Sequence, residues 1–267
     1  MSTSEQTEIE RKYDVDDEAV VPDLEGVTSV EGGAERVLEA ARVDRAAPVR
    51  LRAVYHDTDD HLLLRSRVTL RRRTGGHDQG WHLKLPPSAA DAASSGQEMS
   101  SEISQGSGTD HSTAASTSDG STRGRREVHA PLGSEDEGVP AELLARVEEQ
   151  LGGRPVAPVI VLETTRTATT LVDTGGAALA ELADDVVTAT VTGGEIRAGE
   201  GGRGAAGTGA EPVVRRWREW EAELAPGVDG PSGDALLDAI EARLLAAGAV
   251  PSTSRSKLAR GLGAEPT

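Results

Sequence analysis

The sequence predicts a β-rich α+β domain without the alternating strand–helix order of a parallel sheet. Short runs in which apolar and charged residues alternate, each bounded by turn residues, predict half-buried strands. The 31 Gly and 13 Pro residues make up about a sixth of the 267-residue chain and mark many turns. Aromatic residues account for only 2%, with no Phe, so we expect a core of Val, Leu and Ala with a few Trp and Tyr.

Nine segments have the length and composition of strands and end at turn signals. They are Glu5–Val15, Leu51–Asp57, Leu62–Thr74, Gly80–Leu85, Gly124–Pro131, Val156–Thr165, Ala168–Asp173, Ala178–Thr192 and Val213–Leu224. Several alternate strictly between apolar and charged residues, and this pattern is typical of antiparallel sheets with one dry face.

Three segments are predicted to be helices: Gly33–Arg42, Pro140–Leu151 and Asp234–Ala247. The second has Pro in its first turn and is followed by a pair of Gly residues, which are typical start and stop signals. The third carries five Leu and Ile residues at helical spacing and is followed by Gly248.

Two segments are predicted to be flexible insertions in a single domain covering residues 1–267. Residues 86–124 contain 11 Ser and 4 Thr, and residues 193–210 contain 8 Gly. Such segments bury too little apolar surface to offset the loss of chain entropy. Lengthening a turn between two strands to 39 residues costs only roughly 1.8 kcal/mol, so one domain tolerates it.

Charge and cysteine content exclude several classes of protein. With 28 basic and 45 acidic residues the formal charge is −17, which disfavours a general nucleic-acid or membrane binder. The absence of Cys excludes disulfide scaffolds, Cys-ligated zinc and thiol nucleophiles. No apolar run approaches the ~18 residues of a spanning helix, and the N-terminus lacks the features of a secretory signal. We therefore expect a soluble, cytoplasmic protein.

Six strands carry ionised residues at every second position, which places them on one face of each strand. The sets are Glu8, Glu10 and Lys12; Arg71 and Arg73; His82 and Lys84; Arg125, Glu127 and His129; Glu181 and Asp185; and Glu219, Glu221 and Glu223. For any one strand, an outer face exposed to solvent explains the row of charged residues. Repetition favours a lined site, because like charges side by side are unfavourable unless an opposite charge lies between them. Glu triplets are typical of metal sites, and rows of Arg and Lys are typical of phosphate sites.

Lysine use supports the same interpretation. Of the 28 basic residues only three are Lys, at positions 12, 84 and 257, and two of these lie on the charged faces. An ammonium group is a compact point charge that a planar guanidinium does not replace.

The ordered motifs together resemble the CYTH domains, also called triphosphate tunnel metalloenzymes. In the N-terminal half, Glu8-Ile9-Glu10-Arg11-Lys12 resembles the ExExK signature, Tyr55-His56-Asp57-Thr58 resembles the YxDT turn, and Leu70-Arg71-Arg72-Arg73 resembles the LRxR strand. Trp81-His82-Leu83-Lys84 resembles the strand that ends in a phosphate-binding Lys, and Arg125-Arg126-Glu127 resembles the RxE strand. Further along, Glu181 and Asp185 resemble the ExxxD strand, Glu221-Ala222-Glu223 resembles the late ExE strand, and Ser256-Lys257 resembles the C-terminal SK. Arg166 lies where the family places another Arg. His82 departs from the family, which often has Thr or Ser there. We expect Asp57 to cap its turn rather than contact substrate.

The resemblance implies an eight-stranded antiparallel β-barrel that forms a tunnel, with helices outside and the charged faces inside. It implies that the phosphates are bound by Lys12, Arg71, Arg73, Lys84, Arg125, Arg166 and Lys257. It implies that Mg²⁺ or Mn²⁺ is bound by Glu8, Glu10, Glu181, Asp185, Glu221 and Glu223. Glu8, Glu10 and Lys12 are the expected catalytic residues.

The resemblance predicts a metal-dependent hydrolase of inorganic triphosphate or a related small organic triphosphate. Adenylate cyclase and thiamine triphosphatase activities of the same family are alternatives, and an RNA 5′-triphosphatase is disfavoured by the negative charge. A non-catalytic polyphosphate-binding module, with a CHAD-type partner domain, is the alternative from another class. The complete set of acidic residues favours catalysis.

Overall fold

The strands form one antiparallel sheet in the computed structural model, which describes residues 3–29, 37–87, 124–191 and 212–264. The strands are β1 (Ser4–Glu8), β2 (Glu10–Asp14), β3 (Arg42–Arg45), β4 (Val49–Asp57), β5 (Thr69–Thr74), β6 (Gly80–Leu85), β7 (Arg125–Ala130), β8 (Ala157–Val172), β9 (Ala178–Val191), β10 (Val213–Leu224) and β11 (Val250–Pro251). Their order is β1-β7-β6-β5-β4-β8-β9-β10-β2-β11, and β3 pairs with β8 beside this path. The predicted α+β class and the antiparallel sheet are confirmed.

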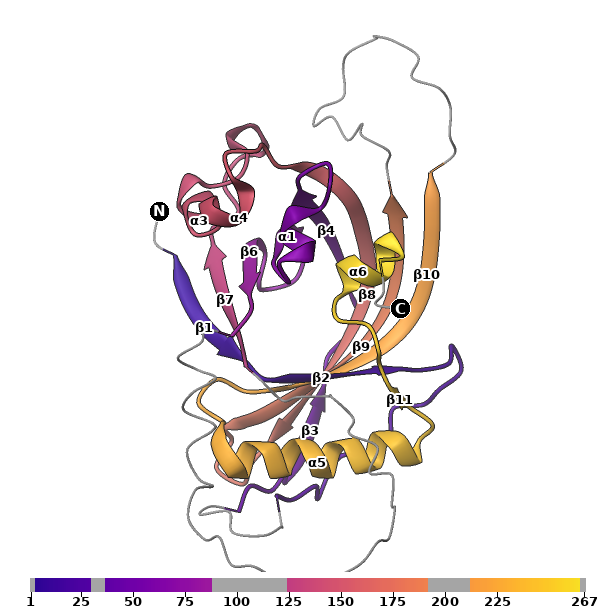
Figure 1. Cartoon of the computed structure of the whole chain (residues 1–267). Helices are drawn as coiled ribbons and strands as arrows, with labels where there is room; N and C mark the ends of the chain where they lie inside the picture. Colours follow the sequence, from indigo (N-terminus) through magenta and orange to yellow (C-terminus); the bar gives the residue numbers. More distant parts are fainter. Residues whose placement is uncertain (1–2, 30–36, 88–123, 192–211, 265–267) are drawn as a thin grey trace, which may run out of the picture.

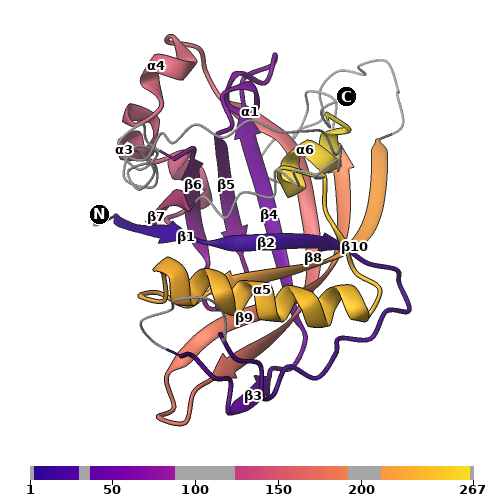
Figure 2. The same ribbon diagram turned by 60° about the horizontal axis from the view of Figure 1, so that its bottom comes forward.

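The first strand of this order, β1, and the last but one, β2, are consecutive in the sequence. Only Ile9 separates β1, which pairs with β7, from β2, which pairs with β10. Figure 2 shows the two strands as one line across the sheet. Within the described residues no pairing joins β1 to β2, so the hydrogen-bonded ladder is not closed into the expected eight-stranded barrel.

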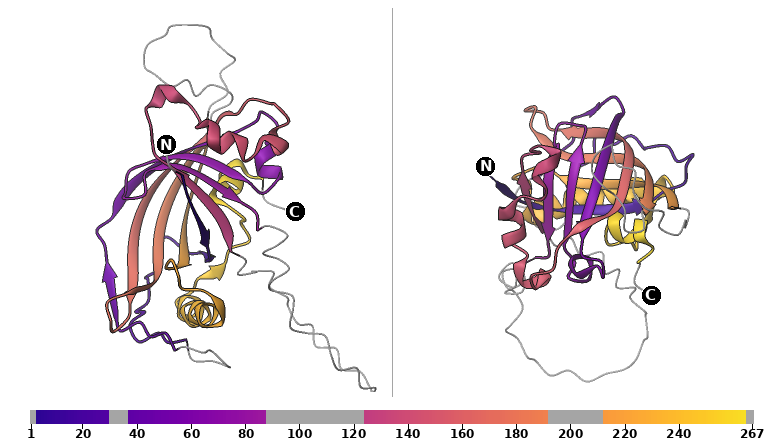
Figure 3. Two further views of the ribbon diagram at one scale, coloured as in Figure 1. Left: turned by 90° about the vertical axis from the view of Figure 1, so that its left-hand side faces the viewer. Right: turned by 90° about the horizontal axis from the view of Figure 1, so that it is seen from above.

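Six short or medium helical segments accompany the sheet within the residues that the structure describes. They are α1 (Leu62–Arg65), the 3-10 turn η1 (Glu135–Glu137), α3 (Ala141–Ala145), α4 (Glu148–Leu151), α5 (Gly230–Ala246) and α6 (Lys257–Leu262). In Figure 1, α5 lies below β2 on the outside of the curved sheet, and α6 lies beside β8. Seen from the side, the strands curve together and α5 is viewed almost along its axis (Figure 3, left). Among the described residues, no helix is long and apolar enough to cross a bilayer.

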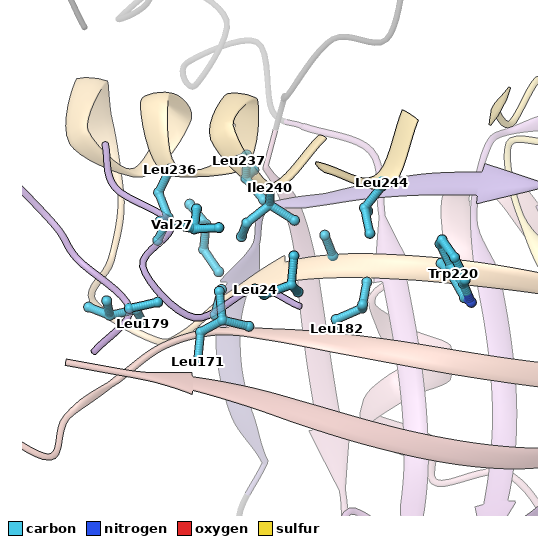
Figure 4. Packing of buried hydrophobic residues seen from close by; sticks show 14 of the residues in the cluster. Leu24, Val27, Leu171, Leu179, Leu182, Trp220, Leu236, Leu237, Ile240 and Leu244 are labelled. Carbon is cyan, nitrogen blue, oxygen red and sulfur yellow. The ribbon is translucent and has the colours of Figure 1, made fainter. Parts of the chain in front are cut away.

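The apolar faces of the strands are covered by these helices. Leu236, Leu237, Ile240 and Leu244 of α5 are fully buried against a cluster that includes Trp220. Figure 4 shows these side chains above Leu182 and Trp220, with Leu24 and Val27 between the helix and the strands. A second cluster joins α1, α3 and α4 to the outer side of β5, β6 and β7, and a third joins α6 to β4, β8, β9 and β10. Because α5 covers the apolar face of β2, β9 and β10, their charged residues lie on the opposite side, where α6 also packs.

Several predicted boundaries were wrong. Residues 37–42 of the predicted helix Gly33–Arg42 are not helical, because Glu39 forms a β-bridge with Thr28 and Arg42 begins β3. The predicted strand Leu62–Thr74 is α1 followed by β5. A run of three Leu residues fits a helical turn as well as a strand, and the capping described below decides for the helix.

Other elements differ only in their breaks. The strands predicted at 156–165 and 168–173 are one continuous β8, and the predicted helix at 140–151 is divided into α3 and α4 at Arg146 and Val147. The predicted insertion 193–210 and all but the ends of 86–124 lie outside the described residues.

Asp57 holds the turn between β4 and α1. Its fully buried carboxylate accepts hydrogen bonds from the backbone N–H groups of Thr58 (2.7 Å), Leu63 (2.9 Å) and Leu64 (3.0 Å). These donors belong to the start of a short helix that has few other acceptors. The contacts agree with the predicted role of Asp57 as a cap.

Asp57→Asn is therefore expected to lower the free energy of unfolding by about 2 kcal/mol, because an amide offers fewer acceptor sites to three buried donors. Denaturant unfolding measures the loss. Asp59→Asn is the control, since its side chain is 86% exposed, and it should change stability by less than ~0.5 kcal/mol. Equal stabilities of the two variants would contradict the capping role.

Candidate functional site

The charged faces of the strands line a cavity of about 980 Å³. The lining includes twelve of the thirteen residues expected at the site, namely Glu8, Glu10, Lys12, Arg71, Arg73, Lys84, Arg125, Arg166, Glu181, Glu221, Glu223 and Lys257. The thirteenth, Asp185, is fully buried directly behind Arg166, whose guanidinium donates to it at 2.8 and 2.7 Å. The structure thus brings together residues from eight strands and α6.

The break at Ile9 explains how the N-terminal segment supplies two acidic groups to one place. Glu8 lies opposite Arg125 of β7, and Glu10 lies opposite Glu223 of β10. Because side chains two residues apart point to the same side of an extended chain, both carboxylates face the cavity. The β7 side and the β10 side of the sheet therefore meet at these two Glu residues.

Lys257 occupies the centre of an acidic triad. Its ammonium lies 3.1 Å from Asp185, 2.5 Å from Glu219 and 2.7 Å from Glu221. Arg166 adds a second contact to Glu221 at 2.9 Å. Burial opposes ionisation of Asp185 and Glu221, but these cations outweigh it and lower the pKa of both carboxyl groups. Asp185 and Glu221 are therefore charged and neutralised from within the protein.

Lys12 forms a second centre beside the triad. Its ammonium lies 3.0 Å from Glu10 and also hydrogen-bonds Glu221. Burial raises the pKa of Glu10, but Lys12 and Lys84 outweigh this effect and lower it to about 2. Glu10 is therefore ionised throughout the physiological range.

A third group joins Glu8, Lys84, Glu127 and His82. Lys84 lies 2.5 Å from Glu8, and the Nδ1 atom of His82 lies 2.9 Å from Glu127. Burial raises the pKa of Glu8 to about 8, helped by a hydrogen bond to Glu127 and opposed by Lys84. Burial raises the pKa of Glu127, but the hydrogen bond with His82 and the charge of Lys84 outweigh this effect and lower the pKa of this carboxyl group.

The arginines form the positive side of the cavity. The Arg71 guanidinium donates to the Tyr55 hydroxyl at 3.3 Å, and Arg73 pairs with Asp78 at 2.7 Å. Burial, together with Arg71 and Arg166, lowers the pKa of Arg73 to about 10. Burial is the largest cause of this lowering, and repulsion from Arg71 and Arg166 adds to it. Neighbouring cations of this kind favour binding of an anion with several charges.

Two groups of carboxylates differ in their fit to a metal ion. In the described part of the chain, Asp185, Glu219 and Glu221 each place an oxygen within 4.8 Å of the others, so this buried triad could hold a divalent metal. Lys257 already contacts all three, and a metal ion would have to displace its ammonium.

The second group is Glu8, Glu10 and Glu223. Among the described residues Glu223 has no ion pair or hydrogen bond, and burial and the charges of Glu10 and Glu221 raise its pKa to about 7. Carboxylate oxygens are the ligands of Mg²⁺ and Mn²⁺. Glu8 already contacts Lys84 and Glu10 already contacts Lys12, so a metal ion would compete with an ammonium group here as it would at the triad.

Some residues of the site were not predicted, and one expected ligand lies at the edge. Glu127 and Glu219 alternate with predicted residues and were visible in the pattern, whereas Asp78 comes from a hairpin loop without periodicity. Tyr55 enters through its contact with Arg71. Arg125 lines the cavity, but its guanidinium donates to the exposed Arg67 carbonyl at 3.1 Å.

The raised pKa values of Glu8 and Glu223 predict how stability depends on pH. At these two groups the folded chain keeps protons that the unfolded chain releases above pH 4.5, so their contribution to the free energy of unfolding falls as pH rises from about 4.5 to about 8. The lowered pKa values of His56 and His82 act in the opposite sense, so the effect is read from the difference between wild type and variant. Glu223→Gln should remove its share of this fall, at most about 3 kcal/mol. Urea unfolding in chelator, measured in steps across this range, tests the slope. A parallel fall in wild type and variant would contradict the assignment.

The chain is similar to a known domain family and to two longer proteins. The CYTH domain model matches residues 6–198. Two uncharacterised proteins of Mycobacterium tuberculosis, from strains CDC 1551 / Oshkosh and H37Rv, are each 39% identical over 257 residues, which cover 96% of this chain and 40% of the relative. The chain therefore spans less than half the length of these relatives.

Two solved structures are also similar. A candidate adenylate cyclase of Bacillus halodurans is 15% identical, with a TM-score of 0.49 over 96% of this chain and 97% of the other. A candidate adenylyl cyclase of Hippeastrum with a dominant triphosphatase activity is 14% identical, with a TM-score of 0.42 over 84% and 86% of the two chains.

Proposed function

Because its residues 6–198 match the CYTH domain model, the chain belongs to the CYTH family, and we propose that it hydrolyses inorganic triphosphate or a related small organic triphosphate. One observation carries the proposal. A single cavity holds buried Lys and Arg side chains along β5 and β6 beside buried Glu side chains of β2 and β10. Hydrolysis of a triphosphate needs this combination, since it depends on charge neutralisation and positioning.

The phosphate oxygens would be bound by the cations of the cavity. Arg71, Arg73 and Arg166 offer planar, bidentate donors, while Lys12, Lys84 and Lys257 offer point charges. Arg125 would serve at the rim. In the reaction a water oxygen bonds to the terminal phosphorus, the bridging P–O bond breaks, and the diphosphate leaves with its charge held by this row.

The acidic residues would hold a divalent metal and handle the proton of the attacking water. Glu8, Glu10 and Glu223 are the proposed metal ligands, with Glu181, Asp185 and Glu221 behind them. A bound Mg²⁺ or Mn²⁺ supplies positive charge to the phosphates and lowers the pKa of water. A carboxylate of this set that does not hold the metal would accept the proton of that water.

We also propose that the curved sheet encloses a tunnel. The adjacency of β1 and β2 supports this, because only Ile9 separates the two strands. The backbone N–H of Leu224, at the end of β10, donates to the Ile9 carbonyl at 3.0 Å. A cavity with buried charges of both signs lies on the enclosed side. A cytoplasmic location would supply such substrates.

Two alternatives remain for the same cavity. A polyphosphate-binding module would use the cations without cutting the chain, and a CHAD-type partner domain would accompany it. An adenylate cyclase would release diphosphate from ATP instead of phosphate. The buried acidic residues support the hydrolase, since a binder of polyanions gains nothing from them.

The proposal is tested by phosphate release from inorganic triphosphate, thiamine triphosphate, ATP and long polyphosphate, with Mg²⁺ or Mn²⁺ and with chelator. We expect rapid, metal-dependent release from one short triphosphate. Tight binding of polyphosphate without release would establish the binding module, and diphosphate release from ATP would establish the cyclase.

A further inference from the structure

We infer that Asp78 ends the phosphate-binding row and limits the length of the phosphate chain that the cavity accepts. The inference rests on the proposed function, because it concerns the same cavity. It adds a residue that selects among substrates, and this residue comes from the loop between β5 and β6.

The register of β5 and β6 puts the cations in a line. Arg71 lies opposite His82, and Thr69 lies opposite Lys84, so Arg73, Arg71 and Lys84 follow one another along the strand pair toward Glu8. Each step is two residues, or about 6.7 Å. A linear polyanion lying on this row would run from the loop at one end to the Glu residues at the other.

The loop is folded tightly at its end of the row. Gly75 and Gly76 have φ values of +83° and +74°, and a Cβ atom on Gly75 would collide with the Arg50 carbonyl of β4. The backbone carbonyl of Asp78 lies 2.9 Å from His82 Nε2. These contacts hold Asp78 in place through its main chain, independently of its carboxylate.

The carboxylate itself contacts the last arginine of the row. Its Oδ2 atom lies 2.7 Å from Arg73 Nη1, with the Arg73 side chain 8% exposed and that of Asp78 35% exposed. Burial raises the pKa of Asp78, but Arg73, His82 and Arg71 outweigh it and lower the pKa, so the group is charged at neutral pH. A fixed negative charge therefore stands where a longer phosphate chain would continue.

The row is thus bounded by carboxylates at both ends. At the Glu8 end a divalent metal offsets the negative charge in the proposed function. At the Asp78 end the offsetting charge is Arg73, which the proposed function assigns to the phosphates, so a phosphate group beyond Arg73 would meet the Asp78 carboxylate without a further cation of the row. Repulsion of the wrong ligand, rather than attraction of the right one, is a common source of selectivity.

The test compares Asp78→Asn with wild type on inorganic triphosphate, tetraphosphate and long polyphosphate, each with Mg²⁺. We expect kcat/KM for the two longer chains, relative to triphosphate, to rise about tenfold or more, because a like charge near the ligand is removed. The backbone contact to His82 is kept in this variant. An equal loss for all three compounds would overturn the inference, since Asp78 would then position Arg73.

Asp60→Asn is the matched control. Asp60 also pairs with an arginine at 2.7 Å and is 37% exposed, but it does not line the cavity. Its ratios should equal those of wild type. Should wild type release no phosphate, dissociation constants for the three compounds replace kcat/KM, so that a failed hydrolase proposal is distinguishable from a failed length limit. Unchanged ratios for Asp78→Asn in both measurements would also overturn the inference.

Discussion

Glu10→Gln is expected to lower the turnover of inorganic triphosphate by about 10²- to 10³-fold, the effect of removing one preorganised charge from an active site. Glu10 lies at the junction of β1 and β2, faces the cavity and is ionised, with a pKa of about 2. Glutamine keeps the shape of the side chain but removes the proposed metal ligand. Lys12 retains its contact with Glu221, so we expect the fold to persist.

Turnover and Mg²⁺ binding measured by calorimetry should fall together. Glu5→Gln is the control, because Glu5 lies on β1 but bonds Arg126 and Arg146 outside the cavity. It should leave both quantities unchanged. Metal-dependent turnover retained by Glu10→Gln would contradict the assignment of Glu10.

Lys257→Met is expected to lower the free energy of unfolding by about 3–5 kcal/mol, because the ammonium contacts three buried carboxylates that lose their common partner. Removing it also leaves a triad whose oxygens lie within 4.8 Å of one another. Added Mg²⁺ or Mn²⁺ should therefore stabilise this variant more than wild type. Thermal unfolding with and without metal measures both effects.

Arg260→Met is the matched control for Lys257→Met. Arg260 belongs to the same helix, pairs with Asp14 and lies 5.1 Å above the Trp217 ring. Its contact with the triad is limited to Glu219, at 3.7 Å. We expect a smaller loss of stability without a metal effect. Equal losses and equal responses to metal in the two variants would contradict the role of Lys257. If Lys257→Met does not fold, Lys257→Arg should retain most of the stability without the added response to metal.

The inward faces of the strands could be predicted from the sequence because their period is two. Glu219, Glu221 and Glu223 alternate with Trp220 and Ala222. The structure places Glu221 and Glu223 in the cavity lining, Glu219 in contact with Lys257, and the apolar residues under α5. The apolar spacing of α5 itself was equally clear. Both patterns arise from burial of one face. The buried positions recur at every second residue in a strand and at every third or fourth residue in a helix.

Features that depend on contacts between distant segments could not be predicted. The break at Ile9, which gives β1 and β2 different neighbours, is set by pairing with β7 and β10. Asp78 has no periodic signal, since its position follows from the two Gly residues before it. Leu62–Arg65 looked like part of a strand because the buried Asp57 that caps it acts across the turn.

The most direct test of the proposed hydrolysis is a ³¹P NMR time course of inorganic triphosphate with Mg²⁺ and the wild-type protein. The account predicts that the triphosphate signals are replaced by those of diphosphate and phosphate, and that chelator stops the change. Triphosphate signals that persist unchanged in area, with only the broadening caused by binding, would show that the cavity holds its ligand without cutting it.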